Sequence, residues 1–278
     1  MEVINEKSFF IRIIQKRKKQ NILTHYHDGI ELIQILEGSL KCLIQGKEYT
    51  IYKDYLCIIN QKQLHRIYSV NNEKSCTFQR IIIEPNIFTS NKNVYEKYIE
   101  PILSDNSFSH IISCTKNKAT KEIINFINVI KDIEELKPEA YELSIIAFLH
   151  MIFQNIYILY KSNKKNEKLI SISADALLYR KMSDFLYKNY HRKLSLDDIA
   201  NAGNVSRSKC CILFKKYTQN SPIEFLNLYR LEVSTSLLKN TTDNISTIAF
   251  NCGFGQQSYY NRLFIREYGI TPKEYRKN

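Results

Sequence analysis

Two stretches near the C-terminus decide the fold: residues 194–217 read LSLDDIANAGNVSRSKCCILFKKY, and residues 245–268 read ISTIAFNCGFGQQSYYNRLFIREY. When the C-terminal part is compared with itself at a shift of about 50 residues, the same residue types recur at the same places. The aligned pairs are Gly203 with Gly253, Phe214 with Phe264, Pro222 with Pro272, Glu224 with Glu274, and Phe225 with Tyr275. Two copies of one supersecondary unit are therefore predicted.

Each copy has the layout of a helix, a short turn and a second helix. In the first unit (196–217), Ser195 and Asp198 form a capping-box pattern that begins a helix. Gly203 is expected to end this helix with a positive φ, and Ser206 to cap the next helix. The second unit (245–268) repeats the pattern, with Gly255 as a candidate cap. This is the helix-turn-helix layout, which is typical of DNA-binding proteins.

A connecting helix is predicted from Pro222 through Leu238, which gives a rod of about 25 Å. Such a rod can hold the second helices of the two units about one DNA turn apart. The whole chain carries a formal charge of +12, and from Ser171 onward 16 basic residues face 9 acidic ones. A basic surface attracts nucleic acid, although membranes and acidic proteins remain alternative partners on charge alone.

The C-terminal pattern resembles the AraC/XylS family of transcription regulators. The residues that carry the resemblance are Leu196, Ile199, Ala200, Ser206, Phe214, Lys215, Pro222, Phe225, Leu226, Arg230, Leu237, Leu238, Ile245, Ile248, Ala249, Gly253, Phe254, Ser258, Tyr259, Tyr260, Arg262, Phe264, Gly269, Pro272, Tyr275 and Arg276. The resemblance implies that the second helix of each unit reads a major groove of double-stranded operator DNA. It also implies a homodimer that works with RNA polymerase.

The resemblance assigns candidate DNA contacts position by position. The residues expected to read bases are Arg207, Ser208, Cys211, Ile212, Gln256, Gln257, Ser258, Asn261 and Arg262. Those expected to contact phosphates are Ser206, Lys215, Lys216, Arg230, Lys273 and Arg276. The chain departs from the family at Ile212, where an arginine is frequent, and at Ile265, where a lysine is usual. Apolar contact with thymine methyl groups, or DNA shape, is then expected to supply the specificity of the first unit.

The N-terminal part has the pattern of a small β-barrel. Short runs rich in Ile, Tyr and Phe alternate with turn signals at hairpin spacing. The predicted strands are Phe9–Ile14, Glu31–Leu36, Leu40–Ile44, Glu48–Ile51, Tyr55–Ile59 and Thr77–Ile83. The predicted fold class is therefore α+β multidomain: an N-terminal antiparallel, cupin-like β-barrel with a helical hairpin, and a C-terminal all-α double helix-turn-helix.

Four parts follow along the chain. They are a sensing barrel at 1–118, a helical pair at 119–162 whose second helix begins near Pro138, a linker at 163–174 and a DNA-binding domain at 175–278. The apolar run Leu143–Tyr160 contains His150, Gln154 and Asn155, which suits a buried or interface helix better than a membrane span. Dimerisation and packing against the chain's own barrel remain alternatives for this helix.

Three histidines and one glutamate form the candidate effector pocket: His25, His27, Glu31 and His65. Residues two apart on one strand point the same way, so His25 and His27 are expected to face one side. The pattern resembles that of cupins, in which three His and a Glu bind Fe, Mn, Zn or Ni. Related stretches in AraC-type sensors commonly hold no metal. The favoured interpretation is therefore a small-molecule site without a cofactor, and a metal site is the alternative.

Three functions are compatible with these patterns. The preferred one is a ligand-responsive transcription regulator, an activator rather than an enzyme; the alternatives are a metal-dependent cupin enzyme fused to a DNA-binding module and a DNA-architectural protein. Seven cysteines at irregular spacing favour reduced thiols and a cytoplasmic protein. Charges in the first seven residues argue against an export signal, so no membrane partner is expected.

Overall fold

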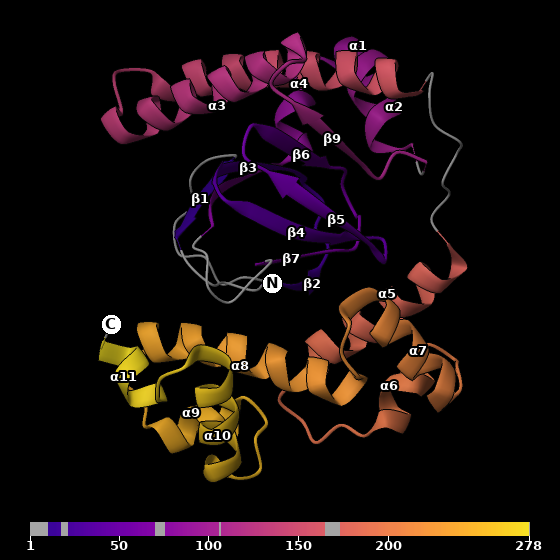
Figure 1. Cartoon of the computed structure of the whole chain (residues 1–278), viewed down its shortest axis with the longest axis vertical. Coiled ribbons are helices and arrows are strands. Elements are labelled where there is room, and N and C mark those ends of the chain that lie inside the picture. Colours follow the sequence, from indigo (N-terminus) through magenta and orange to yellow (C-terminus); the bar gives the residue numbers. More distant parts are fainter. Residues whose placement is uncertain (1–10, 18–21, 70–75, 106, 165–172, 278) are drawn as a thin grey trace. The chain divides into compact units, whose positions relative to one another are not determined.

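The computed structural model describes residues 11–17, 22–69, 76–105, 107–164 and 173–277 (Figure 1). They form two compact units, residues 11–164 and residues 173–277. The first unit contains antiparallel sheets and a helical pair, and the second is entirely helical. The predicted fold class is confirmed.

Among the described residues of the first unit, nine strands build two antiparallel sheets. The five-stranded sheet has the order β1-β8-β3-β6-β9, and the four-stranded sheet has the order β2-β7-β4-β5. The strands are β1 (Ile11–Arg17), β2 (Ile22–His25), β3 (Ile30–Glu37), β4 (Ser39–Ile44), β5 (Lys47–Tyr52), β6 (Tyr55–Ile59), β7 (His65–Ser69), β8 (Thr77–Ile83) and β9 (His110–Cys114).

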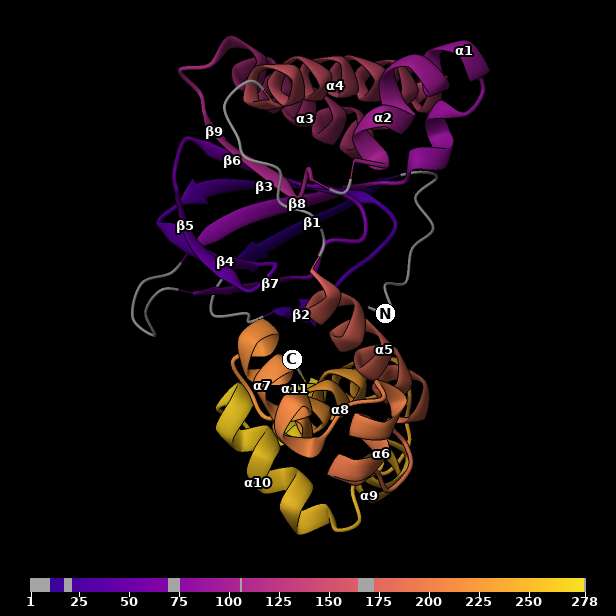
Figure 2. The same ribbon diagram turned by 90° about the vertical axis from the view of Figure 1, so that its right-hand side faces the viewer.

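The alternation of side chains along β3 separates two hydrophobic cores. Ile30 and Leu32 point to one face of the five-stranded sheet and join the core beneath the helices. Ile33 and Ile35 point to the other face and pack with residues of the four-stranded sheet. The unit is therefore layered as helices, five-stranded sheet and four-stranded sheet, which Figure 2 shows from the side. Glu31 shares the direction of Ile33 and so lies between the sheets.

Helices cover the outer face of the five-stranded sheet. After the short turns η1 (Pro85–Phe88), α1 (Lys92–Val94), η2 (Tyr95–Ile99) and α2 (Glu100–Leu103), two long helices pack together, α3 (Lys118–Leu136) and α4 (Tyr141–Lys164). The prediction that Pro138 begins the second helix is wrong. Lys137 has a φ of 43° and ends α3, Ala140 has a φ of 58°, and Pro138 lies in the turn between them.

Helix α4 is a core helix of its own unit. Its residues Ile145, Leu149, Ile152 and Ile156 are buried against α3 and the five-stranded sheet. By length and hydropathy alone the helix could cross a membrane, but the buried face accounts for its apolar character. Dimerisation and packing against the chain's own barrel were the two roles predicted for this stretch. Its buried residues pack within the N-terminal unit. The predicted linker 163–174 starts inside α4, and its residues 165–172 lie outside the described residues.

The second unit contains seven helices among the described residues. They are α5 (Ala174–Asn189), α6 (Leu196–Ala202), α7 (Arg207–Thr218), α8 (Pro222–Asn240), α9 (Ile245–Asn251), α10 (Gln257–Tyr268) and α11 (Pro272–Lys277). The capping box at Ser195 and Asp198 is confirmed, and Ser221 with Glu224 forms a second one at the start of α8. Helix α8 is shared: Phe225 packs on Phe214 of α7, and Leu231 and Leu238 join the core around α9 and α10.

The predicted role of Gly203 is wrong. Its φ is −94°, and the left-handed residue of this turn is Asn204, with a φ of 52°. A glycine is nonetheless required, because a Cβ at position 203 would lie 2.7 Å from Cγ of Met182 on α5. In the second unit Gly253 does have a positive φ, of 87°.

Candidate nucleic-acid interface and effector site

The second helix of the first unit, α7, begins at the capping residue Ser206, whose hydroxyl accepts a hydrogen bond from the Lys209 amide. Arg207, Ser208 and Ile212 are exposed, and Cys211 is half-buried. The Arg207 guanidinium forms an ion pair with Asp197 on α6, which holds the pKa of that carboxyl below its usual range. The first predicted reading helix therefore presents one arginine, already paired within the unit, one serine and one apolar side chain.

The second helix of the second unit, α10, is richer in exposed polar groups. Gln256, Gln257, Ser258 and Arg262 are exposed at its N-terminal end, and Asn261 is half-buried. The Arg262 guanidinium lies 5.4 Å from the centre of the Tyr259 ring. Tyr260, Leu263 and Phe264 occupy the opposite side of the helix in the core, which fixes the polar side outward.

Most of the predicted phosphate-contacting residues lie at the surface. Lys215, Lys216 and Lys273 are exposed, and Ser206 is the exposed capping residue of α7. Lys216 Nζ lies 3.1 Å from a carboxylate oxygen of Asp175, and Lys209 Nζ lies 2.7 Å from the other oxygen. These are exposed ion pairs, which stabilise proteins only slightly. Arg276 is half-buried and donates to the carbonyl oxygens of Leu238 and Asp243 at 3.3 and 2.5 Å.

Arg230, which was predicted to contact phosphate, is mostly buried in the C-terminal unit. It is 8 % exposed, and its Nε and Nη2 donate to the carbonyl oxygens of Tyr190 and Arg192 at 2.8 and 2.7 Å. The guanidinium thereby satisfies carbonyls at the C-terminal end of α5 and also lies over the Phe254 ring. A buried cation with this many partners holds helices together. The family pattern alone could not distinguish this structural role from a contact with DNA phosphate.

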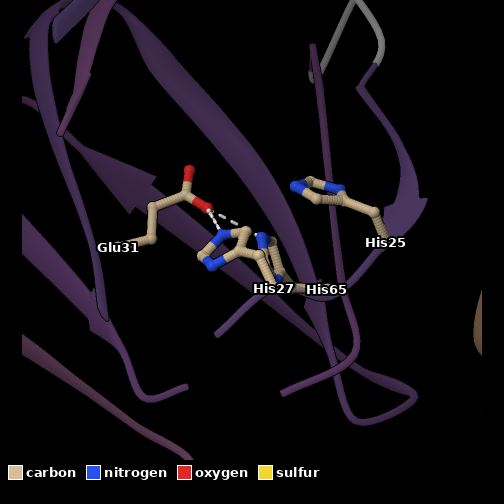
Figure 3. Close-up of side chains that lie close together, drawn as sticks. All are labelled: His25, His27, Glu31 and His65. Carbon is tan, nitrogen blue, oxygen red and sulfur yellow. Dashed lines mark hydrogen bonds and ion pairs between the residues drawn. The ribbon is translucent and has the colours of Figure 1, made fainter. Parts of the chain in front are cut away.

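In the first unit, the structure brings all four residues of the candidate effector site together (Figure 3). His25 ends β2 and pairs with His65 of β7 across the four-stranded sheet. Glu31 reaches them from β3 of the facing sheet, and His27 comes from the connection between β2 and β3. One ligand atom of each residue lies within 4.8 Å of the others. His27 and His65 place Nε2 at 2.9 and 2.8 Å from the same oxygen, Oε2 of Glu31.

A fifth residue completes this cluster and was missed by the sequence reasoning. Arg80 of β8 is fully buried, its Nε donates to Oε1 of Glu31, and its Nη2 lies 3.3 Å from Nε2 of His25. A signal for it existed, because Arg80 is the one charged residue in the Ile-rich stretch Thr77–Ile83. A charge within a buried strand requires a partner.

The electrostatics of the cluster depend on this arginine. Burial raises the pKa of Glu31, but Arg80, His65 and the hydrogen bond from His27 outweigh it and hold the pKa well below its usual range. Burial lowers the pKa of His25 well below its ordinary value, and the nearby His65 and Arg80 act in the same direction. Glu31 is therefore ionised and His25 neutral at physiological pH.

The fold and these two sites define a class of protein, a transcription regulator with an N-terminal ligand-binding unit and two helix-turn-helix units. Residues 10–122 match the family model described as an AraC-like ligand binding domain, and residues 199–278 match a helix-turn-helix domain model. The chain belongs to the AraC/XylS family of transcription regulators.

The chain matches similar proteins over most of their length. The regulator YdeC of Bacillus subtilis is 24 % identical over 253 residues, which cover 91 % of this chain and 85 % of YdeC. The transcriptional activator RhaS of Mannheimia succiniciproducens is 24 % identical over 265 residues, covering 95 % of this chain and 93 % of RhaS. The crystal structure of fatty acid-bound ToxT from Vibrio cholerae matches 98 % of this chain and 97 % of ToxT, with a TM-score of 0.55 and 19 % identity. This last likeness shows the fold.

Proposed function

We propose that this regulator binds operator DNA through α7 and α10 and that a ligand held by the histidine cluster adjusts this binding. The observation that carries the proposal is the pair of helix-turn-helix units, each of which exposes the N-terminal part of its second helix. Exposed polar side chains at that place are suited to the edges of base pairs in a major groove.

The two helices are expected to read DNA in different ways. On α10, Gln256, Gln257 and Asn261 are suited to adenine, and Arg262 to guanine, because these side chains can form paired hydrogen bonds with those bases. On α7, Ile212 and Cys211 offer apolar contact to thymine methyl groups, and Arg207 must leave Asp197 before it can donate to a base. We therefore assign most of the direct readout to α10. Ser206, Lys215, Lys216, Lys273 and Arg276 remain the proposed phosphate contacts.

The proposed sensor is the cluster of His25, His27, Glu31 and His65. It lies between the two sheets of the first unit, which is matched by a ligand-binding family model. The ToxT structure of the same fold holds an unsaturated fatty acid. By analogy with RhaS and with the lactose operon transcription activator of Staphylococcus xylosus, we infer that the protein activates transcription together with RNA polymerase in the cytoplasm.

We further propose that the protein forms a homodimer through the exposed side of α4. Leu143, Met151 and Ile158 are exposed although large and apolar, and they recur along one side of the helix. The opposite side of the same helix is buried in its own unit. Exposed apolar surface of this kind favours association with another protein surface.

The test is genome-wide mapping of bound DNA in cells, followed by binding of the purified full-length protein to a recovered sequence. Affinity should fall steeply with salt, because each neutralised phosphate contributes about −0.9 to the slope of log K against log salt. The fragment 171–278 should retain binding, since α5 to α11 carry both reading helices and their cores. A flat salt response, or no recovered sequence preference, would contradict the proposed DNA contacts.

A further inference from the structure

We propose that the ligand sensed by the N-terminal unit is a divalent transition-metal ion, bound by Nε2 of His25, His27 and His65 and by Oε2 of Glu31. This inference rests on the proposed sensing function of that cluster. It goes further by naming the chemical class of the ligand and the four atoms that bind it.

The spacing of the donor atoms suits one ion. They all lie within 4.8 Å of one another, and two of the pairs are at 2.8 and 2.9 Å. Atoms that share an ion at about 2.0–2.2 Å lie roughly 3–4 Å apart. The four donor atoms are therefore close to the separations that one shared ion requires, and only small shifts of the side chains would be needed.

The outer nitrogen of each ring is already engaged. Nδ1 of His25, His27 and His65 lies 2.8, 2.9 and 2.8 Å from the carbonyl oxygens of Leu23, Gly29 and Gln63, respectively. A carbonyl oxygen only accepts hydrogen bonds, so each Nδ1 carries a proton, and the lone pair of each neutral ring is on Nε2. Hydrogen bonds of this type fix the tautomer and the orientation of metal-binding histidines. Three such bonds in one cluster leave Nε2 of each ring as the atom that can bind a metal.

A cation in the cluster accounts for two of its short contacts. The short contacts of His27 and His65 Nε2 with Oε2 of Glu31 require either a proton or a cation between the atoms of each pair. A bound cation accepts electron density from all of these atoms at once. The contact of Arg80 Nη2 with His25 Nε2 supports the same tautomer, because a guanidinium only donates.

Arg80 also positions the carboxylate. Its bond to Oε1 leaves Oε2 of Glu31 directed at the histidines, and both side chains are fully buried. The Arg80 charge offsets that of Glu31, so the histidines must supply most of the affinity. Three neutral histidines are sufficient to bind Zn²⁺ in known sites. A site of three imidazole nitrogens and one oxygen favours Zn²⁺, Ni²⁺, Cu²⁺ or Fe²⁺ over Mg²⁺ and Ca²⁺.

The experiment uses the full-length protein, treated with EDTA, desalted, and titrated with Zn²⁺ and separately with Co²⁺. We expect about one ion per chain, Co²⁺ absorption bands in the visible range, and no binding of Mg²⁺ under the same conditions. Zn²⁺ at 100 times its dissociation constant should raise the Tm of the N-terminal unit by about 5–10 °C.

Two ligand variants and one control separate the site from general zinc binding. His65→Ala removes a buried ligand, and His27→Ala removes one whose side chain is 21 % exposed and is therefore tolerated by the fold. Each should weaken Zn²⁺ binding more than about ten-fold. His110→Ala, at a histidine of β9 outside the cluster, should bind Zn²⁺ as the wild type does. Equal binding by wild type and a folded His27→Ala variant would overturn the proposal.

The DNA measurement distinguishes this inference from the proposed function. Affinity for a mapped operator should change at least five-fold between Zn²⁺ and EDTA in the wild type, and not in His27→Ala. If Zn²⁺ binds without changing operator affinity, the ion is not the signal and the inference is overturned. If the wild type binds the operator but binds no metal, the inference is also overturned. The proposed DNA-binding function would then remain intact.

Discussion

Arg230 Nε donates a hydrogen bond of 2.8 Å to the carbonyl oxygen of Tyr190, and this contact joins α8 to the end of α5. Arg230→Ala should therefore lower the free energy of unfolding by about 2–4 kcal/mol, because buried carbonyls lose a charged donor. Chemical denaturation of the fragment 171–278 measures this loss. Lys273→Ala, at an exposed residue, should leave stability unchanged and weaken DNA binding instead. If Arg230→Ala were as stable as the wild type and weakened only DNA binding, the phosphate contact first predicted would be supported.

The two glycines that precede α10 should respond differently to substitution. Gly253 has a φ of 87°, and a Cβ there would lie 2.6 Å from the carbonyl oxygen of Tyr190 and 2.9 Å from Nη2 of Arg230. Gly253→Ala should therefore destabilise the C-terminal unit by about 1–3 kcal/mol. Gly255→Ala is the matched control, since nothing lies within 4 Å of its Cβ position. Thermal unfolding of both variants tests the difference, and equal Tm values would contradict it.

Arg262 and Lys216 should differ in how they affect sequence preference. Arg262→Ala should weaken binding to a mapped operator by about 1–3 kcal/mol and relax the preference at one base pair. Lys216→Ala should weaken binding to all sequences alike and reduce the salt slope by about 1. Binding to a library of operator variants at several salt concentrations measures both effects. The same uniform loss in both variants would show that α10 is not a reading helix.

The two sides of α4 should respond differently to an added charge. Ile158 is 47 % exposed, whereas Ile152 is fully buried. Ile158→Asp should prevent dimerisation without a loss of stability, and Ile152→Asp should unfold the N-terminal unit because it buries an unpaired charge. Sedimentation and circular dichroism measure the two outcomes. A dimer that survives Ile158→Asp, together with Met151→Asp, would exclude this side of the helix as the interface.

The N-terminal unit should lose stability as the pH falls below neutrality. Burial, with Lys47 nearby, lowers the pKa of His110 to about 4, whereas the unfolded chain has the ordinary value of 6.5. A depressed folded pKa means that the unfolded state binds protons first, so the stability is present above pH 6.5 and is lost as the pH falls toward 4. His110→Gln should reduce the pH dependence of unfolding between pH 7 and 5, and the part due to His25, whose pKa is also lowered by burial, should remain. The exposed His191→Gln control should retain the dependence of the wild type.

Local patterns predicted the helices and the capping of α6, because a capping box and a 3.6-residue period each involve only residues that are close together in the sequence. The convergence of His25, His27, Glu31 and His65 was also predictable, from strand alternation and the cupin resemblance. Strand β9 was missed, whereas β2 and β7 were expected only as the strands that carry His25 and His65 and were given no bounds.

Several residues have surroundings that depend on partners distant in the sequence. Arg230 has the charge of a phosphate contact, but the carbonyl oxygens that it meets belong to residues 38 and 40 positions away. Arg80 is 49 positions from Glu31. Gly203 is required by Met182 rather than by its own φ. In each case the deciding contact is tertiary, and no periodicity or spacing in the sequence reports it.

Because α8 supplies Phe225 to one core and Leu231 and Leu238 to the other, neither helix-turn-helix unit is an independent folding module. Removing the chain after Asn240 would expose the apolar residues by which the shared helix α8 packs on α9 and α10. A change of operator preference is therefore expected to come from substitutions at the exposed residues of α7 or α10. Exchange of one whole helix-turn-helix unit for another would disrupt the core that α8 shares.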